Sequence, residues 1–231
     1  TNQAGLWTDS RYFLQAAQQL KGTEIKLYKE MLPETPSISV FLSTQLTPGD
    51  AVGIDGKMFS AEEVERMQAE LQKCQIKVKS ISDPLDKLWT DRPPMPEAPA
   101  FIYETQYAGK SSTEKISIIR EELKKCNAKA LFLSALDEIA WTLNLRGSDV
   151  HCNPVVVSYL LIEEQHTHFF IQPQKITPVV ANYLKGIGVS LHPYEEVETY
   201  LNRINVDSLL INPAKTCLLY TSDAADEARS V

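Results

Sequence analysis

The sequence has no long apolar run. None of its 231 residues belongs to an uninterrupted apolar stretch of the ~18–20 residues that a membrane-spanning helix requires. The opening residues, Thr1 to Trp7, have neither the basic nor the apolar region of a secretory signal. Glycine and proline are also few, at 9 and 13 residues, which excludes collagen-like and low-complexity chains. We therefore expect a globular protein with no membrane partner.

Cysteine and excess positive charge are scarce as well. The four cysteines, Cys74, Cys126, Cys152 and Cys217, are scattered and show no Cys-x-x-Cys spacing. This pattern favours a reduced, cytoplasmic compartment over a disulfide framework. The net charge of −7 argues against nucleic acid or an anionic membrane as the main partner.

Complete catalytic motifs are absent from the sequence. It contains no His-Glu-x-x-His, no Gly-x-Ser-x-Gly, no phosphate-binding loop and no zinc spacing of Cys and His. His166 and His168 lie two apart on an expected strand and face one side, but further metal ligands are not evident nearby, so a surface-facing pair is favoured. His151 and Cys152 adjoin a turn without an obvious third partner. Spacing alone therefore identifies no catalytic or metal-binding residue.

Strand and helix patterns alternate along the chain, which is typical of the α/β class. N-cap residues and apolar periodicity predict helices, and short alternating or apolar runs predict strands. We expect helices over 11–20, 37–46, from Ser60 to Cys74, and over 112–126, 136–145, 177–184 and 195–204, and strands over 24–28, 51–54, 75–81, 130–133, 154–162, 167–172, 189–194 and 208–212.

A proline-rich segment divides this pattern in two. Four prolines fall within residues 91–99, which indicates an extended linker. The order of elements is similar before and after it. We therefore predict two related α/β domains over residues 1–99 and 100–216, each a mixed sheet flanked by helices.

The last residues form a different kind of sequence. Residues 217–231 read CLLYTSDAADEARSV, and Cys217 to Glu227 resemble a translated sequencing adapter. We expect this segment to be an artefact, with the natural chain continuing past Thr216. A genuine short amphipathic terminus is the alternative.

Three motifs, in order, carry a family resemblance. Residues 6–16 read LWTDSRYFLQA and residues 88–93 read LWTDRP. Residues 135–141 read ALDEIAW, followed by NLRGSD at 144–149 and NPV at 153–155. Together they resemble the first two domains of the three-domain Xaa-Pro aminopeptidase (aminopeptidase P) family of metallopeptidases, which is related to prolidase and creatinase. Ser10 stands where the family usually has glycine.

The resemblance implies a fold and a division of labour. It implies two creatinase-N-terminal-like (ribonuclease-H-like) domains, with the opening of the first one missing. The family's catalytic centre lies in a C-terminal pita-bread domain, where two Asp, one His and two Glu hold two metal ions, usually manganese. All these ligands would lie beyond Thr216, so we expect this fragment alone to hold no cofactor and to be inactive.

One functional residue is implied within the chain. By the resemblance, Arg11 reaches the active-site mouth and contacts substrate; by residue type alone, it would pair with Asp9 or a nearby Glu as a surface ion pair. Other motif residues are interpreted as structural. Trp7 and Trp141 are expected to be core anchors, Trp89 to pack on the first sheet, and Arg146 to pair with Asp149, with an inter-domain or subunit contact as the alternative for that pair.

The function expected from the resemblance is that of an N-terminal, non-catalytic part of a Xaa-Pro aminopeptidase. The intact enzyme would act on short peptides with proline at the second position. The fragment would shape the active-site entrance, contact substrate and support a homodimer. One alternative is a pseudo-peptidase that serves as a binding or scaffold module, and another is a creatinase or prolidase relative.

Overall fold

The computed structural model describes residues 3–221, and contacts divide the chain into two units. The first unit comprises the residues up to Asp55 together with Glu63–Asp83. The second comprises Gly56–Glu62 and the residues from Pro84 onward. The predicted domain boundary at residue 99 stays a prediction.

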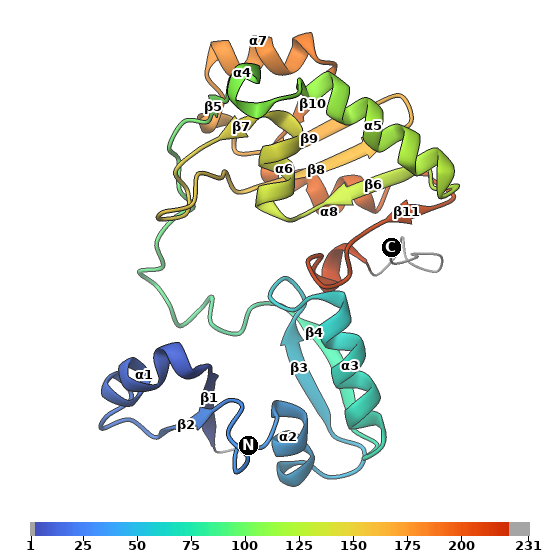
Figure 1. Cartoon of the computed structure of the whole chain (residues 1–231). Helices are drawn as coiled ribbons and strands as arrows, with labels where there is room; N and C mark the ends of the chain where they lie inside the picture. The colour runs from blue at the N-terminus through green and yellow to red at the C-terminus, as the bar shows by residue number, and fades with distance from the viewer. Residues whose placement is uncertain (1–2, 222–231) are drawn as a thin grey trace. The chain divides into compact units, whose positions relative to one another are not determined.

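The first unit is built from two pairs of parallel strands (Figure 1). Strand β1 (Ala4–Thr8) pairs with β2 (Ile25–Lys29), and α1 (Phe13–Gln19) connects them. Strand β3 (Ala51–Asp55) pairs with β4 (Lys77–Ile81) across α3 (Ala61–Gln72). Strand β1 was not among the predicted strands, whereas the other elements follow the expected order. Parallel neighbouring strands require a crossover connection, which α1 and α3 provide.

Local sequence signals account for the helices of the first unit. Helix α2 (Ile38–Gln45) begins after Ser37, whose hydroxyl accepts a hydrogen bond from the Val40 backbone N–H at 3.2 Å. Helix α3 buries Val64, Met67 and Leu71, as its apolar periodicity predicts. The prediction that Cys74 continues this stripe is wrong: α3 ends at Gln72, and Cys74 is exposed.

The second unit contains a five-stranded mixed sheet in the order β10-β9-β8-β6-β11 (Figure 1). Strands β8 (Ser158–Glu163) and β9 (Thr167–Ile171) form the expected antiparallel pair. Strand β6 (Ala130–Leu133) lies antiparallel to β8 and parallel to β11 (Leu209–Leu210). Strand β10 (Val189–His192) runs parallel to β9 through α7 (Pro178–Gly186). The α/β class is thereby confirmed.

The remaining elements of the second unit are short apart from one helix. A two-stranded antiparallel pair joins β5 (Phe101–Ile102) to β7 (Leu145–Arg146). Residues 91–99 hold neither helix nor strand, as their prolines predict. The helices are α4 (Thr105–Ala108), α5 (Ser112–Lys125), α6 (Leu136–Leu143) and α8 (Val197–Leu201).

Helices cover both faces of the five-stranded sheet. Leu160 and Ile162 of β8 pack with residues of α5, α6 and α7. Leu161, between them in the sequence, packs on the opposite face with Val197 and Leu201 of α8. Successive strand residues point to opposite faces of a sheet, so a strand that is covered on both sides needs apolar residues in succession. Residues 159–162 of β8, which read YLLI, form such a run.

Helix α5 is fixed at both ends by polar contacts. At its start, Ser111 and Glu114 form a capping box, in which the Glu114 carboxylate accepts from the Ser111 N–H at 2.8 Å. At its end, Lys125 pairs with Glu122 at 2.7 Å. The three-residue spacing of this pair places the two side chains next to each other on the helix surface.

A buried lysine joins α5 to the end of α6. The Lys115 ammonium donates to the Trp141 carbonyl at 2.8 Å and to Asn144 Oδ1 at 2.6 Å. It also lies 4.6 Å from the centre of the Trp141 ring. Burial lowers the pKa of Lys115, while the carbonyls at a helix C-terminus favour a cation. This cation therefore holds two helices together.

The prediction that Trp141 is a core anchor is wrong, and the packing of Trp89 on the first sheet stays a prediction. Trp141 is 47% exposed and Trp89 is 48% exposed, whereas Trp7 is half-buried. Trp141 lies on the outer side of α6, over Lys115. Trp89 stacks with the Arg92 guanidinium at 5.0 Å. Both rings contact cations, an environment that apolar periodicity does not reveal.

The predicted Arg146–Asp149 pair is also wrong. The Asp149 carboxylate accepts hydrogen bonds from Lys175 Nζ and, at 2.6 Å, from the Val157 N–H. Both side chains of the Asp149–Lys175 pair are fully buried. Arg146 instead donates to the carbonyls of Ala140 and Leu145, at 2.6 and 2.8 Å. A buried carboxylate requires a buried cation, and Lys175 supplies it.

The expected artefact begins within the described residues. Residues Leu218–Tyr220 form a short 3-10 turn, and Tyr220 packs against Phe132 and Tyr159 with ring centres 5.9 and 5.1 Å apart. Residues 222–231 lie outside the described residues, and the origin of the segment stays a prediction.

Within the described residues, each helix is too short or too polar to cross a membrane.

The Asp149–Lys175 pair is expected to be a major contribution to stability. Asp149→Ala leaves a buried ammonium without its counter-charge, so we expect a loss of about 3–5 kcal/mol. Urea unfolding measures the difference. The matched control is Lys125→Ala, which removes an exposed surface pair and should leave the free energy of unfolding close to that of the wild type. Equal losses in the two variants would contradict this assignment.

Candidate functional site

Arg11 lies in a tight turn directly after the first strand. Strand β1 ends at Thr8, and the 3-10 turn Ser10–Tyr12 leads into α1. Asp9 caps this turn: its backbone is extended, with φ −81° and ψ 172°, and its carboxylate accepts from the Arg11 N–H at 2.9 Å. Asp9 therefore provides the cap of the turn that leads into α1.

Aromatic packing holds the strand from which this turn departs. The Trp7 ring stacks on Tyr28 with centres 4.0 Å apart and meets the Phe41 ring edge-on at 5.2 Å. Its indole N–H donates to the Pro36 carbonyl at 2.9 Å. A Cβ on Gly5 would lie 2.6 Å from a Trp7 ring atom, so the stack requires glycine there. Trp7 is thus a structural anchor two residues before Asp9.

The Arg11 guanidinium makes a two-point contact with Asp9. Arg11 Nε donates to Asp9 Oδ1 at 3.0 Å, and Nη2 donates to Oδ2 at 2.7 Å. These hydrogen bonds lower the pKa of Asp9 to about 2 and raise the pKa of Arg11, so both groups stay charged at neutral pH. The surface ion pair expected from residue type alone is therefore present.

The ion pair leaves part of the guanidinium available. Contacts through Nε and Nη2 occupy one edge of the planar group, and a guanidinium carries five N–H donors. The part of the chain that the structure describes places no hydrogen-bond acceptor on Nη1. The Arg11 side chain is 78% exposed. Its outer edge can therefore bind a carbonyl or carboxylate oxygen.

The two histidines of the predicted surface pair differ in environment. His166 is exposed in the turn before β9, whereas His168 is buried on that strand. His168 Nε2 lies 2.9 Å from Glu163 Oε2, and its Nδ1 lies 3.0 Å from His192 Nε2. The prediction of a surface-facing pair is wrong for His168, because β10 and α8 cover the position that it occupies.

The polar cluster around His168 has a consistent pattern of donors. A carboxylate only accepts, so His168 donates to Glu163 through Nε2 and its neutral ring accepts at Nδ1. The Tyr200 hydroxyl lies 3.0 Å from Nε2 of the same ring. Sequence reasoning missed His192 and Tyr200 as partners, although the alternation of β10 could have placed His192 beside His168.

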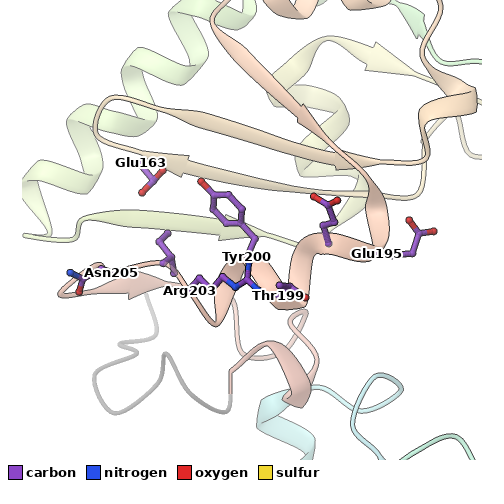
Figure 2. A pocket seen from close by; sticks show the side chains of 8 residues that line it. Glu163, Glu195, Thr199, Tyr200, Arg203 and Asn205 are labelled. Atoms are coloured by element: carbon purple, nitrogen blue, oxygen red, sulfur yellow. The ribbon is translucent and has the colours of Figure 1, made fainter.

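A hollow of about 720 Å³ lies beside this cluster (Figure 2). Glu163, Tyr200 and Arg203 are among its lining, and Figure 2 shows that they come from the end of β8 and from the α8 region. Within the described residues, no group of three or more His, Cys, Asp or Glu is arranged to hold a metal ion. The carboxylate of Glu163 is engaged by His168. We assign no reaction to this hollow.

The remaining candidate nucleophiles are isolated. Cys152 is exposed in the turn around Val150–Asn153, and His151 beside it is exposed. None of the four cysteines, all of which lie in the described part of the chain, forms a disulfide. The expectation that His151 and Cys152 form no nucleophilic pair stays a prediction.

The buried histidine should make stability depend on pH. Burial is the main cause that lowers the pKa of His168 below the ordinary value of 6.5, and it outweighs the raising effect of Glu163. The unfolded chain then binds a proton more readily, so stability should fall as the pH drops below about 6.5. Groups facing His168 are Glu163, His192, Tyr200 and His166.

We expect His168→Asn to flatten this dependence between about pH 5 and 7, because an amide does not titrate. Urea unfolding across that range measures the slope. His151→Asn is the matched control and should keep the wild-type slope. A His168→Asn variant with an undiminished slope would assign the dependence to another group.

Comparisons with known proteins place the chain in a family. Two family profiles, both described as creatinase/prolidase N-terminal domain, match residues 1–88 and 91–231. Aminopeptidase P2 of Arabidopsis thaliana is 37% identical over 199 residues, covering 85% of this chain and 28% of that protein. Xaa-Pro aminopeptidase 1 of Dictyostelium discoideum is 34% identical over 226 residues, covering 93% of this chain and 36% of that protein. The chain thus spans about a third of the length of these curated relatives.

A solved structure gives the same result. X-prolyl aminopeptidase from Caenorhabditis elegans, described as a cytosolic enzyme with a di-nuclear active site, matches with a TM-score of 0.93 and 28% identity. The match covers 100% of this chain and 39% of that one. These matches confirm the resemblance that the three motifs indicated. The chain belongs to the creatinase/prolidase N-terminal domain family.

Proposed function

We propose that this chain is the non-catalytic N-terminal part of a Xaa-Pro aminopeptidase. The intact protein would hydrolyse the bond between an N-terminal residue and a following proline. The main support is the 37% identity to aminopeptidase P2 over 85% of this chain, a match that covers only 28% of the relative. The chain would therefore work beside a larger part that carries the reaction chemistry.

The catalytic metals are assigned to that larger part. The solved relative is described as having a di-nuclear active site, which supports two metal ions in the intact protein; we propose manganese. The residues that the structure describes do not supply a donor set for such a centre. The role proposed for this chain is therefore to bind and orient the peptide.

Arg11 is the residue that we propose for this role. Its guanidinium is exposed on a turn, with its outer edge directed away from Asp9. Tyr12 and Leu14 beside it are 48% and 83% exposed, so apolar surface adjoins the cation. An extended peptide would place its backbone carbonyl oxygens on the guanidinium and its side chains on the apolar surface. Arg11 would thereby help to position a short peptide at the active-site entrance.

Two further properties belong to the proposal. We propose a cytosolic enzyme, supported by the description of the C. elegans relative and by the absence of disulfides among the four cysteines. We also propose that the intact protein forms a homodimer, which this chain supports. Size-exclusion chromatography with light scattering measures the oligomeric state of the full-length protein.

The division of labour is tested with the chain and the full-length protein side by side. We expect the full-length protein to bind two metal ions and to cleave Xaa-Pro peptides, and the chain alone to do neither. Metal analysis after gel filtration and a peptide-cleavage assay measure both. Metal binding or cleavage by the isolated chain would contradict the proposal. Two Asp, one His and two Glu encoded beyond Thr216 support the enzyme, whereas their replacement would favour a scaffold.

The role of Arg11 is tested by substitution in the full-length protein. Arg11→Ala should lower kcat/KM for Xaa-Pro peptides by roughly 10- to 100-fold, the usual cost of losing a hydrogen bond from a charged group. Unfolding by urea should be little changed, because the side chain is exposed. Lys26→Ala is the matched control, since Lys26 is another exposed cation of the first unit. Unchanged kinetics in Arg11→Ala would overturn the contact.

A further inference from the structure

We propose that Asp9 is a positioning residue for Arg11, which it holds so that the outer edge of the guanidinium faces a neutral peptide carbonyl. This inference rests on the proposed function, in which Arg11 contacts the peptide. Asp9 is then a second residue of the site, and the site prefers a neutral carbonyl as its acceptor.

The contacts tie the side chain of Arg11 to its own backbone turn. Asp9 Oδ1 accepts from both the backbone N–H and Nε of Arg11, at 2.9 and 3.0 Å, while Oδ2 accepts from Nη2 at 2.7 Å. Asp9 is also the N-cap of the turn. One carboxylate thus fixes the start of the turn and the direction of the guanidinium together.

This arrangement differs from two other surface ion pairs among the described residues. Arg92 Nη1 lies 3.9 Å from Asp86 Oδ1. Lys57 Nζ lies 3.9 Å from Glu198 Oε2. The contact at Asp9 is closer and made at two points, and a two-point contact fixes the plane of a guanidinium. The geometry therefore sets Arg11 apart from a general surface cation.

Holding the guanidinium has two chemical consequences. An exposed arginine loses rotational freedom when it binds a ligand, and a guanidinium that is already held loses less. The Asp9 carboxylate also balances the charge of Arg11, and its lowered pKa, about 2, keeps it ionised at neutral pH. A balanced pair attracts a neutral carbonyl by hydrogen bonding and attracts a carboxylate less than a lone cation does. Asp9 would thus favour internal peptide carbonyls over a free C-terminal carboxylate.

The experiment uses the full-length protein and one short Xaa-Pro peptide in two forms, with a free C-terminal carboxylate and with a C-terminal amide. Asp9→Ser keeps a side-chain acceptor for the turn but cannot hold the guanidinium at two points. We expect kcat/KM for the amide to fall by roughly 3- to 10-fold, the cost of ordering one side chain. The ratio of kcat/KM for the free acid to that for the amide should rise.

A double variant separates positioning from a structural role. In the Arg11→Ala background, Asp9→Ser should have no further effect on kcat/KM, because Asp9 acts through Arg11. Ser37→Ala is the control for cap loss: it removes the cap of α2, and its kinetics should match wild type. Asp9→Asn, which keeps the shape and loses the charge, serves if Asp9→Ser does not fold.

The outcomes distinguish this inference from the proposed function. Unchanged kinetics in Arg11→Ala would overturn the substrate contact and this inference with it. A weakened Arg11→Ala beside an unchanged Asp9→Ser would overturn the positioning role alone. Effects that add independently in the double variant, or an unchanged ratio between the two peptide forms, would do the same.

Discussion

The two-point contact between Asp9 and Arg11 gives a direction to a side chain that would otherwise rotate freely in solvent. It depends on a turn that begins where β1 ends, and that strand is held in turn by the stacking of Trp7 on Tyr28. The direction of the guanidinium therefore depends on the capped turn, and the position of the turn depends on the aromatic stack. A functional cation on the surface is thus set by packing a few residues earlier in the chain.

Local signals in the sequence were sufficient for most elements of this fold. Ser37 and Ser111 mark the starts of α2 and α5, because a hydroxyl next to a helix satisfies backbone N–H groups that have no other partner. The apolar run in β8 identified a strand that is buried on both faces. These signals act over a few residues, and each is visible in the sequence without knowledge of the tertiary structure.

Contacts between distant residues were not predictable in the same way. Asp149 has charged neighbours close in sequence, but its partner is Lys175, 26 residues away. His168 belongs to a cluster that β10 and α8 complete. Trp141 looked like a core residue by composition, yet its ring covers a buried lysine. In each case the deciding factor is which segments the fold brings together. For the candidate site, the sequence supplied both the family's Arg11 and its possible partner Asp9, and the structure supplied the geometry between them.

The charged groups of the two units are handled in opposite ways, and this suits the proposed division of roles. In the second unit, Lys115 and Lys175 are buried and satisfied by a helix end and by a carboxylate, so they are committed to stability. In the first unit, Arg11 is exposed, and its partner occupies only one edge of the guanidinium. A buried cation must satisfy its donors within the protein because water cannot reach them. An exposed cation held on one side keeps donors for a ligand. Arg11 therefore has what a binding group needs, which is a fixed direction together with N–H donors that Asp9 does not occupy.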